Sequence, residues 1–342
     1  MSTQDTRNYT TISPSARSLL LLKGYTNIPY ARQAAALIQY PEPYEPDFSN
    51  RQAGFWIRVM HFEARYQSIN NLLADLLPAT DGSAAAAVAA AAAAGATPQP
   101  VNILEISSGF SFRGLVLAAE RPVHYVDTDL PEVITTKQRL IADLTDGQPA
   151  EASDDNVLRG HYELRPLNAL DTSAFRAIVD SIPSGPIIIV NEGLLMYLGK
   201  EEKQQLCQFI SKVLHERGGY WITADIYIRR SIPDDPELQQ GDTLKEFFKQ
   251  HRVQENMFES FDEATQLFAD AGLVLDKEAE SDYTNLSAAP YFMASASPEL
   301  LQRLRSGGKV NAIWRLRPTP SSNSSPGSTT PPSPPGSSPS AA

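Results

Sequence analysis

The chain has 342 residues, of which 42% are hydrophobic and 20% are charged, an ordinary composition for a globular protein with room for one large domain or two small ones. Its formal net charge is −11 and it has no basic run, which argues against nucleic acid and anionic membranes as partners. Cys207 is the only cysteine, which excludes a disulfide within the chain and a cysteine-rich metal site.

Residues 1–78 have the pattern of a helical cap. Apolar residues recur at helical spacing between Phe55 and Leu76. The first residues lack the charged-then-apolar pattern of a secretory signal, so we expect a cytoplasmic protein. Residues 79–100 hold an alanine tract that predicts a variable linker or a weak helix. A membrane span is the less favoured alternative, because alanine contributes little transfer energy.

From residue 101 onward, strand-like apolar runs alternate with helical stretches. The predicted strands are 101–107, 122–127, 161–167, 186–190 and 219–226. The predicted helices between them are 112–120, 130–145, 172–181 and 200–216. This alternation favours an α/β fold with a doubly wound, mostly parallel sheet.

The last third of the chain is predicted to complete that sheet. Residues 227–258 are a candidate lid, because they form a long polar insert with scattered aromatics. A helix at 261–271 precedes two strands near 273–281 and 290–296, which would form an antiparallel hairpin at one edge and bring the sheet to seven strands. The sheet domain is thus expected to span 101–316. The Pro- and Ser-rich residues 317–342 are predicted to be a disordered tail.

A glycine turn follows the first predicted strand, and a carboxylate follows the second. Gly109 lies in the turn, and the acids at the end of the next strand come about 20 residues later, the spacing with which α/β sheets hold a ribose. A dinucleotide loop needs three glycines, but Ser107 stands where the first would be and no third follows. The pattern therefore favours S-adenosylmethionine, which has no phosphate. A plain strand-to-helix turn is the alternative.

Polar residues follow the next strands as well. Asp127 and Asp129 are candidate ribose acceptors, although Asp129 is an equally good candidate for the N-cap of the next helix. Asn168 follows the third strand and can face an adenine, whereas Asp171 is predicted to be a helix cap. Glu192 follows a continuous apolar run, where a carboxylate is costly without a partner. We expect Glu192 to be functional, with a satisfied structural carboxylate as the alternative.

Three motifs together resemble the leucine carboxyl methyltransferase family, which includes O-methyltransferases of polyketide biosynthesis. They are Glu105 to Arg113, Tyr125 to Ile134 with Lys137, and Asn-Glu-Gly-Leu-Leu-Met-Tyr-Leu at 191–198. The resemblance covers roughly residues 13–296. It implies a Rossmann-like class I methyltransferase fold and S-adenosylmethionine as the methyl donor.

The resemblance also implies roles for residues at matching positions. Arg17, which precedes Gly24-Tyr25, and Arg65 would hold the donor's carboxylate, because a guanidinium can grip a carboxylate with two hydrogen bonds. Two positions depart from the family pattern: Ser107 replaces the first loop glycine, and Asn168 stands where many members have Asp. The expected donor site comprises Arg17, Arg65, Glu105, Gly109, Asp127, Asp129, Asn168, Ala169 and Glu192, with Tyr197 in the substrate pocket.

The expected activity is in-line methyl transfer to a carboxylate or hydroxyl of a small, polyketide-like molecule or to a C-terminal carboxylate. A carboxylate acceptor needs no general base, whereas a hydroxyl does. His61 and Tyr197 are candidates for that role, but neither is assigned to it. The alternatives are an NAD(P)-dependent oxidoreductase and a non-catalytic donor-binding homologue. We expect no metal site, because the five histidines are scattered without ligand spacing.

Overall fold

The structure is a computed structural model that describes residues 13–38, 51–77, 100–145, 160–229, 247–280, 283 and 285–320. Residues 79–99 of the predicted linker, 230–246 of the candidate lid and 321–342 of the predicted tail lie outside this part of the chain. Within it, no helix combines the length and apolar character needed to cross a bilayer.

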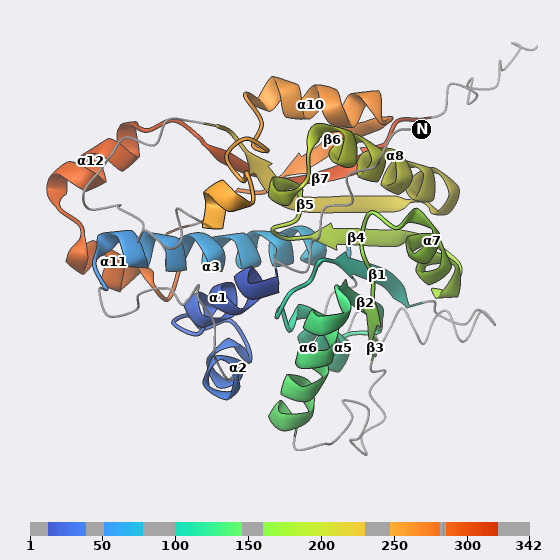
Figure 1. Ribbon diagram of the computed structural model, residues 1–342, viewed down its shortest axis with the longest axis horizontal. Helices are drawn as coiled ribbons and strands as arrows, with labels where there is room; N and C mark the ends of the chain where they lie inside the picture. Colours follow the sequence, from blue (N-terminus) through green and yellow to red (C-terminus); the bar gives the residue numbers. More distant parts are fainter. Residues whose placement is uncertain are drawn as a thin grey trace, which may run out of the picture.

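A single seven-stranded sheet organises the molecule (Figure 1). Its strands follow the order β3-β2-β1-β4-β5-β7-β6. Strands β1 to β5 pair in parallel, and β7 runs antiparallel to both of its neighbours. The predicted α/β fold with a doubly wound, mostly parallel sheet is therefore confirmed. The strands are β1 (Val101–Ile106), β2 (Val123–Asp129), β3 (His161–Pro166), β4 (Ile187–Asn191), β5 (Gly219–Tyr227), β6 (Leu273–Glu278) and β7 (Asn311–Pro318).

Helices cover both faces of the sheet. Helices α7, α8 and α10 pack on one face, and α3, α5 and α6 pack on the other. The central strand β4 is buried throughout, because Ile187 and Ile189 face the first layer while Ile188 and Val190 face the second. The helices are α1 (Ser13–Lys23), α2 (Ala31–Leu37), α3 (Ala53–Ala74), α5 (Arg113–Glu120), α6 (Pro131–Leu144), α7 (Thr172–Ser181), α8 (Lys200–Arg217), α10 (Phe261–Asp270), α11 (Ala289–Ser295) and α12 (Pro298–Ser306).

The prediction of a strand near 290–296 is wrong, because this segment is helix α11. Pro290 lies in the first turn, where the missing N–H costs nothing, and Phe292 packs toward α3 in a shared apolar cluster. The antiparallel strand that completes the sheet is β7 instead, which lies between β5 and β6. Its last residue, Pro318, is beyond the boundary predicted at 316.

Helix α3 packs against both the other helices near the chain start and the sheet. Its first half packs against α11 through Phe55 and Val59. Its second half packs directly on the strands through Ile69, Leu72 and Leu73, each at most 1% exposed. The helical character predicted for the start of the chain is present. In the described part of the chain, α3 continues from that segment across the sheet face.

Candidate functional site

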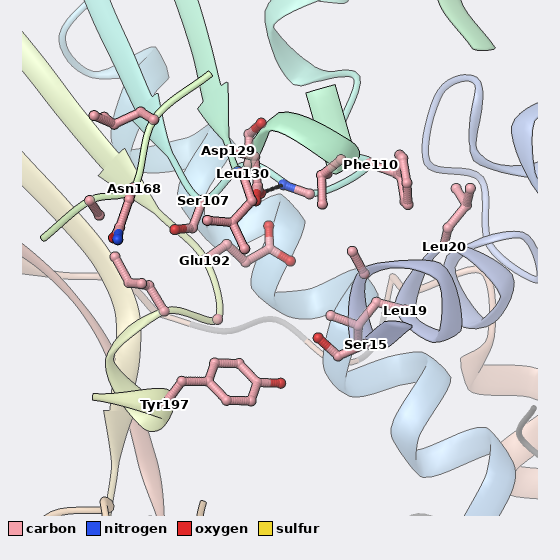
Figure 2. Close-up of a pocket in the computed structure, with 18 of the residues that line it drawn as sticks. Ser15, Leu19, Leu20, Ser107, Phe110, Asp129, Leu130, Asn168, Glu192 and Tyr197 are labelled. Carbon is pink, nitrogen blue, oxygen red and sulfur yellow. Dashed lines mark hydrogen bonds between the residues drawn. The ribbon is translucent and has the colours of Figure 1, made fainter. Parts of the chain in front are cut away.

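A pocket lies at the carboxyl ends of β1 to β4, where the strand order reverses between β1 and β4. Ligands bind at this crevice in open α/β sheets. Helix α1 closes the side opposite the strands, so that Ser15 and Leu19 face Glu192 across the opening (Figure 2). The lining residues come from α1 (Ser15, Ala16, Leu19, Leu20, Lys23) and from the segments after the strands (Ser107 to Phe110, Asp129, Leu130, Val133, Leu167 to Leu170, Glu192 to Leu194, Tyr197, Leu198).

The loop after β1 turns through two left-handed residues. Gly109 has φ 52°, which suits a residue without a Cβ, and Ser107 has φ 53°, which is unusual for a serine. Asp129 fixes this loop, because its Oδ2 accepts a 2.7 Å hydrogen bond from the Gly109 N–H (Figure 2). Its Oδ1 accepts another, also 2.7 Å, from Leu130 N–H. The carboxylate therefore joins the β1 loop to the start of α6 at the pocket wall.

Asp129 borders the helix without capping it. Leu130 is the N-cap residue of α6, and Pro131 begins the helix. Burial raises the pKa of Asp129 to about 6, against the lowering effect of the two backbone N–H donors. Because each carboxylate oxygen has a second lone pair, Asp129 can still accept hydroxyl groups from a ligand. Asp171, by contrast, is a true N-cap, as predicted, and accepts hydrogen bonds from Ser173 N–H and Ala174 N–H.

Glu192 is the centre of a buried ion network. Lys23 Nζ lies 2.8 Å from Oε1, Arg65 Nη2 lies 3.1 Å from Oε1, and Arg113 Nη2 lies 3.1 Å from Oε2. Burial alone would raise the pKa of Glu192, but these three cations hold it well below its usual range. The residue is an ionised carboxylate surrounded by positive charge.

The cations around Glu192 also face other carboxylates. Arg113 pairs with Glu105 on β1, and the buried Asp225 carboxylate acts on Arg65. Lys23 is the cation of this group that lines the pocket, and burial lowers its pKa although Glu192 opposes the effect. Lys23 therefore places a positive charge at the pocket wall, where it can attract an anionic ligand group.

A second buried carboxylate shapes the segment that carries Glu192. Asp225 on β5 accepts hydrogen bonds from the backbone N–H groups of Gly193 (2.6 Å), Leu194 (2.6 Å) and Leu195 (2.9 Å). It also accepts one of 2.7 Å from the side chain of Asn191. These bonds hold the chain in the turn after β4, where Gly193 has φ 85°. Asp225 therefore fixes the backbone on one side of the pocket.

The structure brings six of the ten expected residues into the pocket lining: Gly109, Asp129, Asn168, Ala169, Glu192 and Tyr197. Arg65 lies behind the lining and contacts Glu192 and the Tyr227 hydroxyl. The remaining three, Arg17, Glu105 and Asp127, do not line the pocket.

Glu105 and Asp127 lie in the core, outside the pocket lining. Both residues are 0% exposed. Glu105 accepts hydrogen bonds from Arg113 and Tyr125, and Asp127 accepts them from Lys137 on α6 and Tyr162 on β3. Their carboxylates are thus used within the core. Lys23, six residues after Arg17 on the same helix α1, lines the pocket instead.

Three functional candidates were missed from the sequence: Lys23, Arg113 and Asp225. Lys23 directly precedes the Gly24-Tyr25 pair, so the signal for it was present. Arg113 ends the motif that begins at Glu105, but no local pattern shows that it reaches Glu192, 79 residues away. Asp225 lies in a strand, and only the adjacency of β4 and β5 reveals its role.

Two aromatic hydroxyls lie near the network. The Tyr197 hydroxyl points toward Ser15 across the pocket (Figure 2). The Tyr227 hydroxyl accepts a hydrogen bond from Arg65 (2.9 Å) and lies 2.8 Å from His61 Nε2. Burial and the Arg65 charge lower the pKa of His61 to about 3, so this imidazole is neutral near pH 7. Of the two candidate bases, only Tyr197 lines the pocket.

No protein-family model and no curated protein matches the chain. Solved structures with a similar fold include LepI in complex with SAM, at 13% identity over 65% of this chain and 44% of LepI (TM-score 0.37). OxaC in complex with sinefungin and meleagrin is 12% identical over 66% of this chain and 44% of OxaC (TM-score 0.37). The mitomycin 7-O-methyltransferase MmcR is 10% identical over 92% of this chain and 69% of MmcR (TM-score 0.41).

This chain therefore spans less than half the length of LepI and OxaC. The strand order and pairing by themselves establish the fold.

Proposed function

We propose that the protein is an S-adenosylmethionine-dependent O-methyltransferase that binds its donor in the pocket at the β1–β4 switch point. The observation that carries this proposal is the convergence of three features in one pocket. They are the left-handed turn at Gly109, the Asp129 carboxylate and the cluster of cations around Glu192 with Lys23 at the pocket wall. They offer, in turn, a close backbone approach, a ribose acceptor and a partner for the donor's carboxylate.

The residues present fit this donor. At Gly109 an added Cβ would meet Ala16 Cβ on α1 at 3.6 Å, so the glycine keeps open the space between the loop and α1. Asn168 lies at the end of β3, where its amide can meet an adenine edge, and Ala169 leaves space beside it. Lys23 takes the role expected of Arg17, because its ammonium group is already at the pocket wall. The donor supplies an electrophilic methyl group, and the protein orients the acceptor and excludes water.

We infer that the acceptor is a carboxylate or hydroxyl of a small, polyketide-like molecule or a C-terminal carboxylate. The Tyr197 side of the pocket faces residues 247–258, since Tyr197, Phe247 and Val253 form a buried cluster. This apolar wall suits an aromatic or aliphatic acceptor. A carboxylate is ionised near pH 7 and needs no proton acceptor, which matches a site with a neutral, buried His61 outside the lining. The motifs at 105–113, 125–137 and 191–198 support membership of the leucine carboxyl methyltransferase family.

Donor binding tests the proposal directly. S-adenosylmethionine should raise the melting temperature and bind at one site per chain by calorimetry, and NAD or NADP should do neither. Stabilisation by a nicotinamide cofactor instead would favour the oxidoreductase alternative. Methyl transfer to a panel of carboxylates, phenols and polyketide-like aromatics separates an enzyme from a non-catalytic binder.

A matched pair of glycine variants tests the location of the donor. Gly109→Ala and Gly185→Ala each force a side chain into a left-handed backbone, at φ 52° and φ 114°, so both should lose about 1–2 kcal/mol of stability. Only Gly109 lines the pocket. We expect Gly109→Ala to weaken donor binding and Gly185→Ala to leave it unchanged; equal affinities for both variants would place the donor elsewhere.

A further inference from the structure

Two histidines that are distant in sequence meet at the edge of the sheet. His124 on β2 pairs in register with His161, the first residue of the edge strand β3, and their rings stack with centroids 4.8 Å apart. Glu163 lies two residues further along β3, on the same face. One ligand atom from each of the three side chains lies within 4.8 Å of the other two. The fold thus creates a cluster that the scattered sequence positions did not predict.

Two donor atoms of this cluster, His124 Nε2 and Glu163 Oε1, lie close together. Nε2 of His124 is buried and makes no hydrogen bond of standard geometry within the described chain, although Glu163 Oε1 lies 3.3 Å away. Arg165 holds the other oxygen of Glu163, with Nη2 at 2.7 Å and Nε at 2.8 Å from Oε2. Arg165 therefore turns Oε1 toward the histidines, as an outer group orients a metal-binding carboxylate.

The electrostatics of the cluster favour a bound cation. Burial and the neighbouring His161 lower the pKa of His124, so its imidazole is neutral and can offer a lone pair. The nearby charged groups are Glu163, which attracts a cation, and Arg165, which is already paired with that carboxylate. Ligand atoms on one tetrahedral ion are about 3.4 Å apart for bonds of about 2.1 Å. The His124–Glu163 contact meets this spacing, and one ligand atom of His161 lies within 4.8 Å of both.

We propose that His124, His161 and Glu163 form a binding site for a divalent transition-metal ion, with Zn²⁺ as the best match. Two imidazoles and one carboxylate are a donor set suited to zinc, and they disfavour Mg²⁺, which requires oxygen ligands. Three protein ligands leave a fourth position for water. The site lies at the amino end of β3, opposite the end that carries Asn168, and so is separate from the donor pocket.

A metal ion at this position joins the edge strand β3 to β2. Among the described residues, strand β3 pairs with β2 alone, and the segment that follows it, Leu167 to Leu170, lines the pocket. The ion stabilises the folded chain by linkage, because the three ligands come together only in the folded sheet. Zinc is expected to raise the melting temperature and to slow amide exchange in β3.

Calorimetric titration of tag-free protein with ZnCl₂, in the absence of methyl donor, tests the site. The wild-type chain should bind one Zn²⁺, and Co²⁺ should give the visible absorption of a tetrahedral complex. His161→Ala and Glu163→Gln should each weaken Zn²⁺ binding by at least about tenfold. His161 is exposed, so its removal leaves the fold intact, which circular dichroism can verify.

His215→Ala is the matched control, because His215 lies on α8 and bonds to Ser211 of the same helix. Its Zn²⁺ affinity and the zinc-dependent rise in melting temperature should equal those of the wild type. The proposal is overturned if the wild type binds no stoichiometric Zn²⁺, or if His161→Ala binds it as tightly as His215→Ala. These measurements need no methyl donor, so either outcome leaves the proposed function to its own test.

Discussion

At the scale of single residues, Glu192 shows how a structural and a functional role can coincide. Its carboxylate is the shared partner of Lys23, Arg65 and Arg113, and it also lines the pocket. The sequence analysis set a functional carboxylate against a satisfied structural one, and the network meets both descriptions. A mutation at this position therefore changes stability as well as binding, and the two effects must be measured separately.

Glu192→Gln should lower the free energy of unfolding by about 3–5 kcal/mol, because it leaves buried cations without their counter-charge. Urea denaturation of both proteins measures the difference. Glu120→Gln is the control: Glu120 is exposed at the end of α5, and its substitution should change stability by no more than about 0.5 kcal/mol. A loss below about 1 kcal/mol in Glu192→Gln would show that the network contributes little.

The raised pKa of Asp129 predicts how the stability of the protein depends on pH. Its pKa is raised from 3.8 to about 6, so between these values the folded state binds more protons than the unfolded state. The contribution of Asp129 to stability is therefore present at low pH and declines as pH rises from about 4 to 6. The difference in unfolding free energy between wild type and Asp129→Asn should change across this window and be constant above it.

Ligand binding should show the opposite trend, because only the ionised Asp129 can accept two ribose hydroxyls. Donor affinity should fall as pH is lowered through about 6, and the fall should be absent in Asp129→Asn. Calorimetric titrations at pH 5 and pH 7.5 provide the comparison. The same pH dependence in both proteins would assign it to another group.

At the scale of elements, the sequence predicted most of the sheet and failed where tertiary contacts decide. The alternating runs from 101 to 226 became strands and helices because each has a strong local period. The aromatic run at 290–296 was interpreted as a strand, although Pro290 and the contact of Phe292 with the α3 cluster make it a helix. Strand β7 was missed because Arg315 and Arg317 interrupt its apolar pattern, and ion pairs with Asp276 on β6 offset that polarity.

The backbone of the turn after β4 also depends on a residue of a neighbouring strand, Asp225 on β5. Asp225→Asn should destabilise the protein by about 1–3 kcal/mol, because an amide has one acceptor oxygen for four donors that the carboxylate now serves. Donor affinity should also fall, since this turn carries Glu192 and Gly193 of the pocket. Asp143→Asn on the exposed side of α6 should alter neither property. Unchanged donor affinity in a folded Asp225→Asn protein would remove the turn from the binding site.

At the scale of the whole molecule, the pocket combines the N-terminal helix α1 with segments that follow strands of the sheet. Helix α1 closes a site whose other walls follow four strands, and α3 connects α1 to the sheet. Sequence patterns located the polar residues at the strand ends correctly, because parallel strands bring their carboxyl ends to one edge. They did not reveal that Glu105 and Asp127 face inward, since partners such as Arg113 and Lys137 are supplied by helices that pack only in the folded chain.

The continuity of α3 predicts that the N-terminal helices and the sheet unfold together. Leu73 is 1% exposed against the strands, so Leu73→Ala should cost about 2–5 kcal/mol. Leu37→Ala is the matched control, because Leu37 on α2 is 42% exposed and its loss should cost no more than about 0.5 kcal/mol.

Denaturation followed by far-ultraviolet circular dichroism and by tryptophan fluorescence should give coincident curves that shift together in Leu73→Ala. Trp56 lies in the first half of α3 and Trp221 lies in the sheet, so the fluorescence reports on both parts. Two separated transitions, with only one of them moved by Leu73→Ala, would mean that the helical segment folds as a domain of its own.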